Sequence, residues 1–379
     1  MHQNDDVYTL ALMKSPFPDV EMRYLIQQIQ GRQIAQKKFP TLQREGMIFP
    51  ARIHLEQTSS EATAIYKSQL VQGHTLADIT GGFGIDSIFF SKRFETVYHI
   101  EHNIDLQKIA QENFKTLQYH HIQSYSTDGM TFLKSFKNSM DVIYIDPSRR
   151  DASQKKVFLL QDLQPEILKI LPDLMGRANT ILIKLSPLID ISYLLDQFNF
   201  TKYACEIHVV AVRNEVKEIL VKLGANSTEE RMITAVNLES NDLVFTYDPK
   251  EILSNKIEYA DASKFIYEPN SALLKSGGGD VLANRLGLKK FHPNTHLYSS
   301  DDLLENYPGR VFKLLNKLTN PKKELKNKSI MAVHRNFPEN LKTLKNKYSF
   351  HTDGTLPILF ASSVKKVYMN YLEYINFNK

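Results

Sequence analysis

One short segment, Leu76-Ala-Asp-Ile-Thr-Gly-Gly-Phe-Gly-Ile-Asp86, constrains the fold of this chain more than any other. An apolar run ends in an acid, Asp78, and a glycine-rich turn leads into the helical pattern that begins at Ile85. Glycine lets the backbone adopt positive φ and pass close to a ligand, and the first N–H groups of the helix then face polar or anionic atoms. The segment predicts a βα unit that binds a ligand at its turn. The turn consists of Thr80, Gly81, Gly82, Phe83 and Gly84.

Seven short apolar runs predict the strands of the same domain. They span residues 75–79, 96–100, 122–125, 141–145, 180–185, 207–212 and 218–223. Helical patterns, such as those over 104–117 and 160–171, separate the early runs, and this alternation predicts a mainly parallel sheet with helices on both faces. Too few residues join the last two runs for a parallel crossover, so we expect an antiparallel hairpin. The predicted fold is a doubly wound α/β domain.

The remaining sequence suggests further segments around this domain. Residues 1–74 have helical periodicity, and Ser59 or Ser60 can cap the last of these helices. The α/β domain covers 75–224. After a polar linker, we expect a small ferredoxin-like α+β segment over 232–290 and a second α+β domain over 291–379.

Composition excludes several classes of protein. The single cysteine, Cys205, cannot form an internal disulfide or a cysteine-rich zinc site, and His120-His121 has no neighbours at metal-binding spacing. No stretch approaches the roughly 18 apolar residues of a membrane span, and the N-terminus lacks the features of a signal peptide. We therefore expect a soluble cytoplasmic protein with no metal and no membrane partner.

Two acids follow the second and third predicted strands. Glu101 ends the second, where nucleotide-binding α/β folds place an acid that accepts hydrogen bonds from ribose hydroxyls. A nicotinamide dehydrogenase would show the same pair of motifs, so Glu101 does not by itself identify the cofactor. Asp128-Gly129 follows the third strand, and the expected partner of Asp128 is an adenine amino group.

The fourth predicted strand runs directly into Asp146-Pro-Ser-Arg-Arg150. Ligands in such sheets lie beyond the carboxyl ends of the strands, so Asp146 is expected to face the same crevice as Gly82 and Glu101. Arginine forks suit phosphate or carboxylate. The candidate catalytic residues are Asp146, Pro147 and Ser148. The candidate substrate-binding residues are Arg149 and Arg150, with Lys184, Ser186 and Pro187 after the fifth strand.

The order of these motifs and the terminal hairpin resemble class I S-adenosylmethionine-dependent methyltransferases, whose domain is Rossmann-like with seven strands. The resemblance implies S-adenosyl-L-methionine as the cofactor. It also implies that the turn at Asp78, Gly82 and Gly84 holds the methionine part, Glu101 the ribose and Asp128 the adenine. Thr80 replaces the usual first glycine of the family, and Gly81 is an extra residue.

Narrower resemblances concern the substrate. Asp146-Pro-Ser-Arg149 is similar to the Asp-Pro-Pro-Tyr turn of enzymes that methylate exocyclic amines of bases, but it lacks the aromatic residue that would stack on a base. Phe83 or Tyr144 would then supply the stacking, or the substrate is not a base. Ser59-Ser-Glu-Ala-Thr63 and the glycine turn resemble ribosomal RNA guanine-N2 methyltransferases. The motifs in 267–298 and 335–338 resemble the THUMP-like C-terminal region of a methyltransferase family.

The charge distribution agrees with an RNA partner. Between Arg310 and Lys347 the chain carries eleven lysines and arginines and only two acids, Glu324 and Glu339. A local basic field attracts polyanions, although a lysine-rich solvated surface would look the same in sequence. The sequence thus predicts a methyltransferase that N-methylates a base of a structured RNA. The alternatives are a methyltransferase for a protein or small molecule, a non-catalytic RNA-binding protein with a vestigial cofactor fold, and, less favoured, a nicotinamide dehydrogenase.

Overall fold

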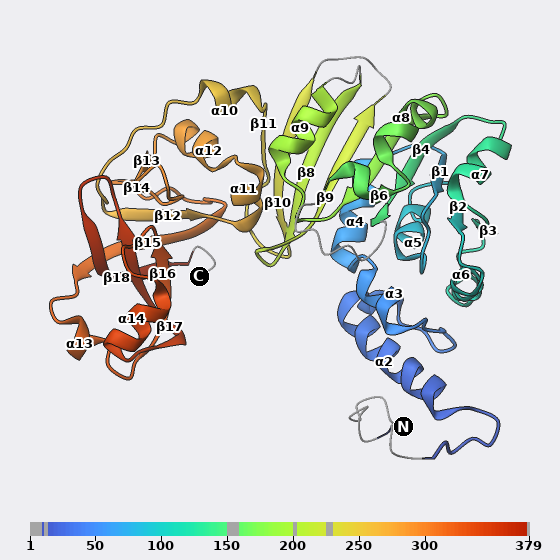
Figure 1. The fold of residues 1–379 in the computed structure, drawn as a ribbon, viewed down its shortest axis with the longest axis horizontal. Coiled ribbons are helices and arrows are strands. Elements are labelled where there is room, and N and C mark those ends of the chain that lie inside the picture. The colour runs from blue at the N-terminus through green and yellow to red at the C-terminus, as the bar shows by residue number, and fades with distance from the viewer. Residues whose placement is uncertain (1–9, 11–13, 150–158, 200–202, 225–229, 377–379) are drawn as a thin grey trace. The chain divides into compact units, whose positions relative to one another are not determined.

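The protein is described by a computed structural model, which covers residues 10, 14–149, 159–199, 203–224 and 230–376 (Figure 1). The chain divides into two compact units. The first comprises Met1–Cys205 and Ile219–Glu230, and the second comprises Glu206–Glu218 and Arg231–Lys379. Two strands, β8 (Ala204–Val212) and β9 (Glu215–Gly224), contribute residues to both units.

The first unit starts with helices and continues as alternating strands and helices. Its initial elements are α2 (Met22–Lys38), the short 3-10 helix η1 (Pro40–Leu42), α3 (Arg52–Gln57) and α4 (Glu61–Leu70). The strands are β1 (Thr75–Asp78), β2 (Thr96–Glu101), β3 (Ile122–Ser126), β4 (Met140–Ile145), β5 (Ser148–Arg149), β6 (Leu163–Gln164) and β7 (Ala178–Leu185). The helices between them are α5 (Ile85–Ser91), α6 (Ile104–Thr116), α7 (Gly129–Ser135), η2 (Leu160–Asp162), α8 (Ile167–Met175) and α9 (Ile191–Asn199).

The main sheet confirms the predicted α/β fold. In the first unit its strand order is β9-β7-β4-β1-β2-β3, with β9 antiparallel to β7 and the other neighbours parallel. The buried strands are nearly continuous apolar runs, as expected where both faces of a parallel sheet are covered. The hairpin after β7 also forms, because β8 (Ala204–Val212) and β9 are joined by Arg213 and Asn214, both at positive φ, which suits a two-residue hairpin turn.

One predicted helix begins later than expected. The pattern over 160–171 is occupied first by η2 and β6, and helix α8 starts only at Ile167. Pro165 lies between β6 and α8. Proline has no backbone N–H and disfavours helical geometry in the residue before it, so Pro165 disfavours a helix that starts at Leu160 and continues through this position.

The second unit is built around two groups of strands. The first has the strand order β11-β10-β8-β9, with β10 (Arg231–Leu238) and β11 (Phe245–Tyr247). The second is a seven-stranded sheet in the order β13-β14-β12-β15-β18-β17-β16. Its strands are β12 (Phe265–Pro269), β13 (Lys289–Lys290), β14 (Tyr298–Ser300), β15 (Gly309–Lys317), β16 (Ser329–Arg335), β17 (His351–Ser362) and β18 (Val367–Ile375). The helices are α10 (Lys250–Ser254), α11 (Ser271–Ser276), α12 (Gly279–Arg285), α13 (Pro321–Glu324) and α14 (Leu341–Tyr348).

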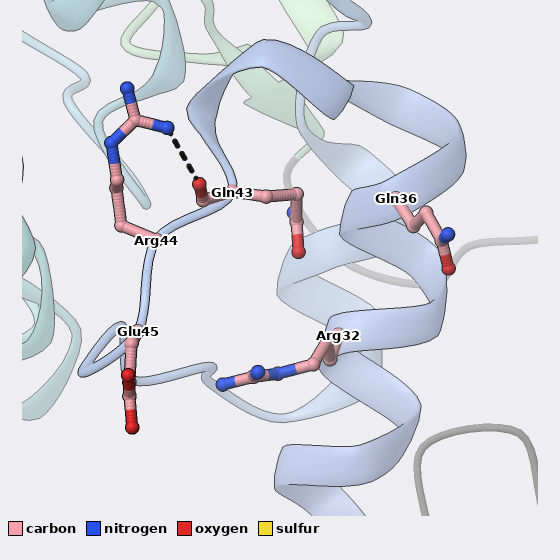
Figure 2. A pocket seen from close by; sticks show the side chains of 5 residues that line it. All are labelled: Arg32, Gln36, Gln43, Arg44 and Glu45. Carbon is pink, nitrogen blue, oxygen red and sulfur yellow. Dashed lines mark hydrogen bonds between the residues drawn. The ribbon is translucent and has the colours of Figure 1, made fainter.

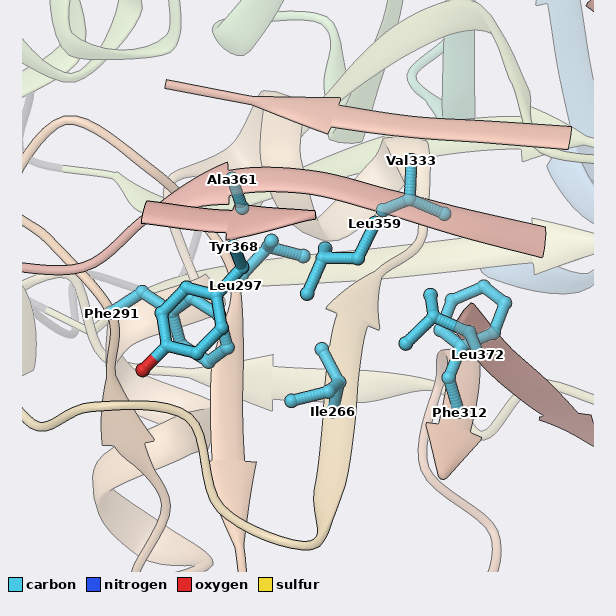
Figure 3. Close-up of a cluster of buried hydrophobic side chains, with 9 residues drawn as sticks. All are labelled: Ile266, Phe291, Leu297, Phe312, Val333, Leu359, Ala361, Tyr368 and Leu372. Carbon is cyan, nitrogen blue, oxygen red and sulfur yellow. The ribbon is translucent and has the colours of Figure 1, made fainter. Parts of the chain in front are cut away.

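The seven-stranded sheet joins the two segments that the sequence separates at residue 290. Figure 3 shows the core of this sheet, where Ile266 of β12 packs with Val333, Leu359 and Leu372 of later strands. Strand β12 pairs with both β14 and β15. The residues on either side of position 290 therefore share one hydrophobic core.

Candidate active site

The strand order reverses at β1, and this reversal places the candidate site. The chain passes from β1 to β2 and β3 on one side and returns to β4 on the other side of β1. In open α/β sheets the crevice for ligands lies beyond the carboxyl ends of the strands at such a point. The glycine-rich turn follows β1 and Asp146 follows β4, so the two strongest sequence motifs meet there.

Two hydrogen bonds join these two turns. The N–H of Ile79 donates to the carbonyl of Tyr144 (3.1 Å), and the N–H of Asp146 donates to Oγ1 of Thr80 (2.7 Å). Thr80 stands where the resembled family has its first glycine. The departure from the family pattern therefore supplies a hydroxyl that ties the turn after β4 to the turn after β1.

The glycines of the turn have different roles. A Cβ on Gly81 would lie 2.4 Å from the His99 ring, and one on Gly84 would lie 2.5 Å from Phe114, so these positions pack closely against the protein. Gly84 also has φ +87. Gly82 has φ +55, yet a Cβ there would meet nothing nearer than 3.9 Å. The turn is thus closed on its inner side and open at Gly82, which leaves room for a ligand to approach the backbone.

Asp78 organises the turn from inside. Its side chain is buried and accepts hydrogen bonds from the Ser87 hydroxyl (2.6 Å) and the Thr80 N–H (3.2 Å). Burial raises the pKa of Asp78 to about 7; the bond from Ser87 opposes this rise, and the charges of Asp86 and Asp146 add to it. The carboxylate therefore serves the shape of the turn, and any contact with a ligand would add to that role.

Glu101, the acid that ends β2, lies against the glycine turn. Its carboxylate accepts hydrogen bonds from the N–H of Gly82 (2.9 Å) and the N–H of Asn103 (2.7 Å), and the residue is 6% exposed. The acid at the end of β2 thus holds the open glycine of the turn after β1 directly.

His99 is a residue of the site that the sequence analysis missed. Its ring is buried between the turn and β3: Nδ1 pairs with the Ser124 hydroxyl (3.0 Å) and Nε2 with the carbonyl of Gly82 (3.3 Å). Burial lowers the pKa of His99, so the ring is neutral at pH 7. A polar residue inside the otherwise apolar run at 96–100 was the available signal.

Asp128 and Gly129 follow β3, and Gly129 brings the start of α7 close to the residue after β1. Asp128 is exposed and caps α7, accepting a hydrogen bond from the N–H of Thr131 (2.9 Å). A Cβ on Gly129 would lie 2.4 Å from the carbonyl oxygen of Ile79. Only glycine allows the start of α7 to approach the turn this closely.

The turn after β4 is fixed from β7. The Lys184 ammonium forms an ion pair with the Asp146 carboxylate, whose side chain is about one-third exposed. Pro147 is buried and Ser148 is exposed at the start of β5. The side chain of Arg149 and all of Arg150 lie outside the described residues.

The residues after β7 form a tight turn at the same edge of the sheet. The Ser186 hydroxyl accepts a hydrogen bond from the N–H of Leu188 (3.3 Å), and the Ser186 carbonyl accepts one from the N–H of Ile189 (3.2 Å). Ser186 and Pro187 are partly exposed. This turn comes shortly after Lys184 in the chain.

A buried polar cluster next to the site includes side chains of the N-terminal segment. The Lys67 ammonium, fully buried on α4, lies 3.2 Å from Asp86 Oδ1 and donates to Ser59 Oγ (2.7 Å). Asp86 Oδ2 accepts hydrogen bonds from Ser59 (2.8 Å) and from the Tyr144 hydroxyl (2.9 Å). Burial would raise the pKa of Asp86, but Lys67 and Lys184 outweigh it and hold that pKa below its usual value.

Two aromatic residues do not have the role that the sequence suggested. Phe83 is 4% exposed and its ring lies 6.2 Å from that of Phe39 and 6.4 Å from that of Phe49. Tyr144 is 1% exposed and engaged with Asp86. The prediction that either ring stacks on a substrate base is wrong, because tertiary packing buries both. Phe83 instead anchors the N-terminal segment to the glycine turn.

A separate cavity lies in the N-terminal part of the first unit (Figure 2). It has a volume of about 260 Å³, and Arg32, Gln36, Gln43, Arg44 and Glu45 line it. Figure 2 shows Arg32 and Gln43 extending into the space between α2 and the loop, while Arg44 donates to the Gln43 carbonyl (2.9 Å) and points away. The residues of the crevice at β1 and β4 do not line this cavity.

In the described part of the chain, no group of three or more His, Cys, Asp or Glu side chains is placed to hold a metal ion. Among the same residues, no helix is both long and apolar enough to cross a membrane.

A protein of known structure resembles this chain over nearly its whole length. It is a candidate methyltransferase from Porphyromonas gingivalis W83, with 29% sequence identity and a TM-score of 0.86. The alignment covers 99% of this chain and 96% of that one. The main sheet has the fold of class I methyltransferases, and the resemblance extends through the C-terminal sheet.

Other solved structures align with less than half of this chain. A candidate methyltransferase from Streptococcus mutans in complex with S-adenosyl-homocysteine is 13% identical over 43% of this chain and 96% of that chain, with a TM-score of 0.33. TrmK from M. capricolum, also with S-adenosyl-homocysteine, is 15% identical over 44% of this chain and 68% of that chain, with a TM-score of 0.33. Similarity this low carries no inference about function.

A model of a ferredoxin-like domain matches residues 265–308. The match begins at β12 and passes position 290, where the sequence analysis ends its ferredoxin-like segment. No protein among those with curated functions matches the chain.

The buried Lys67–Asp86 pair predicts an asymmetric effect of charge removal. Asp86→Asn should lower the free energy of unfolding by about 3 kcal/mol, because it leaves a buried ammonium without its counter-charge. The double variant Lys67→Met/Asp86→Asn should recover at least half of that loss. Urea denaturation measures both, with the exposed Asp105→Asn on α6 as control. Equal stability of Asp86→Asn and Asp105→Asn would contradict a charged pair.

The raised pKa of Asp78 predicts that the stability of the protein depends on pH. The folded protein keeps a proton on Asp78 between pH 4 and 7 that the unfolded chain has lost, so the stability of the native chain falls as pH rises through this window. An asparagine at this position would have no such titration. Asp78→Asn should therefore gain about 2–3 kcal/mol relative to the native chain between pH 5 and pH 8. Thermal unfolding at both pH values measures this, and a pH-independent difference would rule it out.

Proposed function

We propose that this chain is an S-adenosylmethionine-dependent methyltransferase that methylates a nitrogen of a base in a structured RNA, with an exocyclic amine as the favoured acceptor. The observation that carries the proposal is the junction of the turns after β1 and β4. There the backbone at Gly82 is open, and the Asp146 carboxylate lies on the other side of the same switch point.

The residues around the turn suit the proposed cofactor. When bound, S-adenosylmethionine supplies an electrophilic methyl group on a sulfonium. The open backbone at Gly82 would accept its methionine part, Glu101 its ribose and Asp128 its adenine. The other residues proposed for the cofactor-binding surface would support it by keeping the turn in its observed shape. They are Asp78, Thr80, Gly81, Phe83, Gly84 and Gly129.

Asp146 would orient the acceptor. Its carboxylate, or the carbonyl of Pro147, would accept a hydrogen bond from the attacking amine and direct the nitrogen lone pair toward the methyl group. Holding the reactants in line supplies much of the rate, so a strong base is unnecessary. Lys184 and the Thr80 hydroxyl fix Asp146 for this task. Ser148 lies next to Pro147, and the flanking substrate contacts are proposed for Arg149, Arg150, Lys184, Ser186 and Pro187.

The exposed lysines of the second unit support RNA as the proposed substrate. The basic run places its exposed lysines on the end of β15, on α13, on the segment between α13 and β16, and on α14, while Leu325 and Leu344 enter a hydrophobic core. Those exposed lysines are Lys317, Lys322, Lys323, Lys326, Lys328, Lys342, Lys345 and Lys347. Such a surface binds phosphates and loses affinity with salt. We propose it, with the THUMP-like character of 291–379, as the RNA-binding region of a cytoplasmic enzyme.

The proposed cofactor site predicts that the same substitution at two glycines has different effects on cofactor binding. Gly82→Arg should abolish calorimetric binding of S-adenosylmethionine and S-adenosyl-homocysteine, because a side chain there fills the open face of the turn. Gly287→Arg is the matched control, since Gly287 also has positive φ (+67) and open space beside it but lies in the second unit. Loss of binding in both variants, or in neither, would contradict the assigned cofactor site.

Methyl transfer predicts a role for Asp146 beyond binding. Asp146→Ala should retain cofactor binding and reduce transfer from tritiated S-adenosylmethionine at least about 100-fold, the scale of a lost transition-state hydrogen bond. The substrate is an extract that contains RNA and protein from cells that lack this gene, and the exposed Asp173→Ala on α8 is the control. Unchanged transfer by Asp146→Ala would exclude the mechanism. Label on protein but not on RNA would favour the protein-methylating alternative.

A further inference from the structure

The second unit contains a cavity that the proposed methyl transfer does not use. Its volume is about 410 Å³, and it lies between the chain that follows α10 and the corner where α11 meets α12. The residues that line it are Ile252, Asn255, Lys256, Ile257, Tyr259, Gly277, Asp280 and Val281.

Asp280 contributes a carboxylate that buried partners hold in place. Its Oδ2 accepts a hydrogen bond from the Lys290 ammonium (2.7 Å), and its Oδ1 accepts one from the Tyr298 hydroxyl (2.6 Å). Lys290 and Tyr298 are almost fully buried, whereas the Asp280 side chain is 32% exposed. Buried charges are costly unless paired, so this arrangement fixes a carboxylate whose remaining lone pairs are accessible.

The three consecutive glycines before Asp280 allow this arrangement. A Cβ on Gly279 would lie 2.9 Å from the Tyr298 hydroxyl, and one on Gly278 would lie 2.7 Å from the Tyr247 ring. Gly277 ends α11 at φ +80. The glycine run therefore lets two tyrosines approach the backbone beside the cavity.

The other walls suit a flat aromatic ligand. Ile252, Ile257 and Val281 provide apolar surface, and Tyr259 offers an aromatic ring that is 47% exposed. Asn255 adds an amide, and Lys256 adds a cation. An aromatic surface, a carboxylate that accepts from N–H groups and a nearby cation together match a nucleobase that carries N–H donors and a phosphate.

We propose that this cavity binds an unpaired guanine of RNA. The ring N–H and the exocyclic amine of guanine are adjacent donors that a carboxylate can accept together, whereas uracil lacks the amine and hypoxanthine retains only the ring N–H. Asp280 reads these donors, Tyr259 stacks on the base, and Lys256 contacts a neighbouring phosphate. The inference takes RNA as the partner from the proposed function, and it assigns the second unit a base-specific contact in addition to its basic surface.

The test uses the full chain and three fluorescein-labelled RNA pentamers that differ only in the central base: UUGUU, UUIUU with inosine, and UUUUU. Fluorescence anisotropy measures their affinities. The native chain should bind the guanine pentamer most tightly. Tyr259→Ala should weaken that complex about tenfold, as expected for loss of one stacked base. Tyr24→Ala, a tyrosine of similar exposure on α2, is the matched control and should leave the affinity unchanged.

Equal affinity of the native chain for all three pentamers would overturn the inference, as would an unchanged affinity of a folded Tyr259→Ala for the guanine pentamer. Because Tyr259 is about half exposed, thermal unfolding should show the variant to be as stable as the native chain. Titration with S-adenosylmethionine separates the two proposals. Cofactor binding without guanine preference removes only the inference, whereas guanine preference without cofactor binding removes only the proposed methyl transfer.

Discussion

The reversal of strand order at β1 is the constraint on which the first unit depends. Because β2 and β4 flank β1 and both run parallel to it, the segments that leave β1 and β4 diverge at the edge where open α/β sheets bind their ligands. The residues assigned to the site lie on the turns at this edge or near the carboxyl ends of the strands that lead to it. The Thr80 hydroxyl joins two of these turns by accepting a hydrogen bond from the Asp146 N–H, and Gly129 allows the third turn to approach Ile79.

Buried charge distinguishes this site from a merely well-packed turn. Asp78, Asp86 and Lys67 are largely removed from water, and burying ions is unfavourable unless each has partners. Here hydroxyl groups and opposite charges provide those partners. The arrangement also makes the N-terminal helices part of the site, since Ser59 and Lys67 belong to that segment and Phe83 packs on it.

The second unit adds binding chemistry of a different kind. Its exposed lysines present a field that does not depend on base sequence, whereas the cavity beside Asp280 presents a fixed carboxylate acceptor, which we propose for one base. A protein with both could hold RNA through the backbone and select among positions by a single unpaired residue. This division is consistent with the proposed methyl transfer, in which the chemistry requires only an orienting carboxylate and an in-line approach.

Local sequence determined much of this protein. Apolar runs followed by an acid or a glycine turn identified the strands, the turn at 80–84, the Asp146-Pro147 turn and the antiparallel hairpin, because neighbouring residues alone dictate these features. Only the tertiary structure decided which side chains meet. Lys67 with Asp86, Thr80 with Asp146, and the burial of Phe83 and Tyr144 all join residues far apart in the chain. Periodicity shows that a residue is inward or outward, but the identity of its neighbours depends on how distant elements pack, and that information is not local.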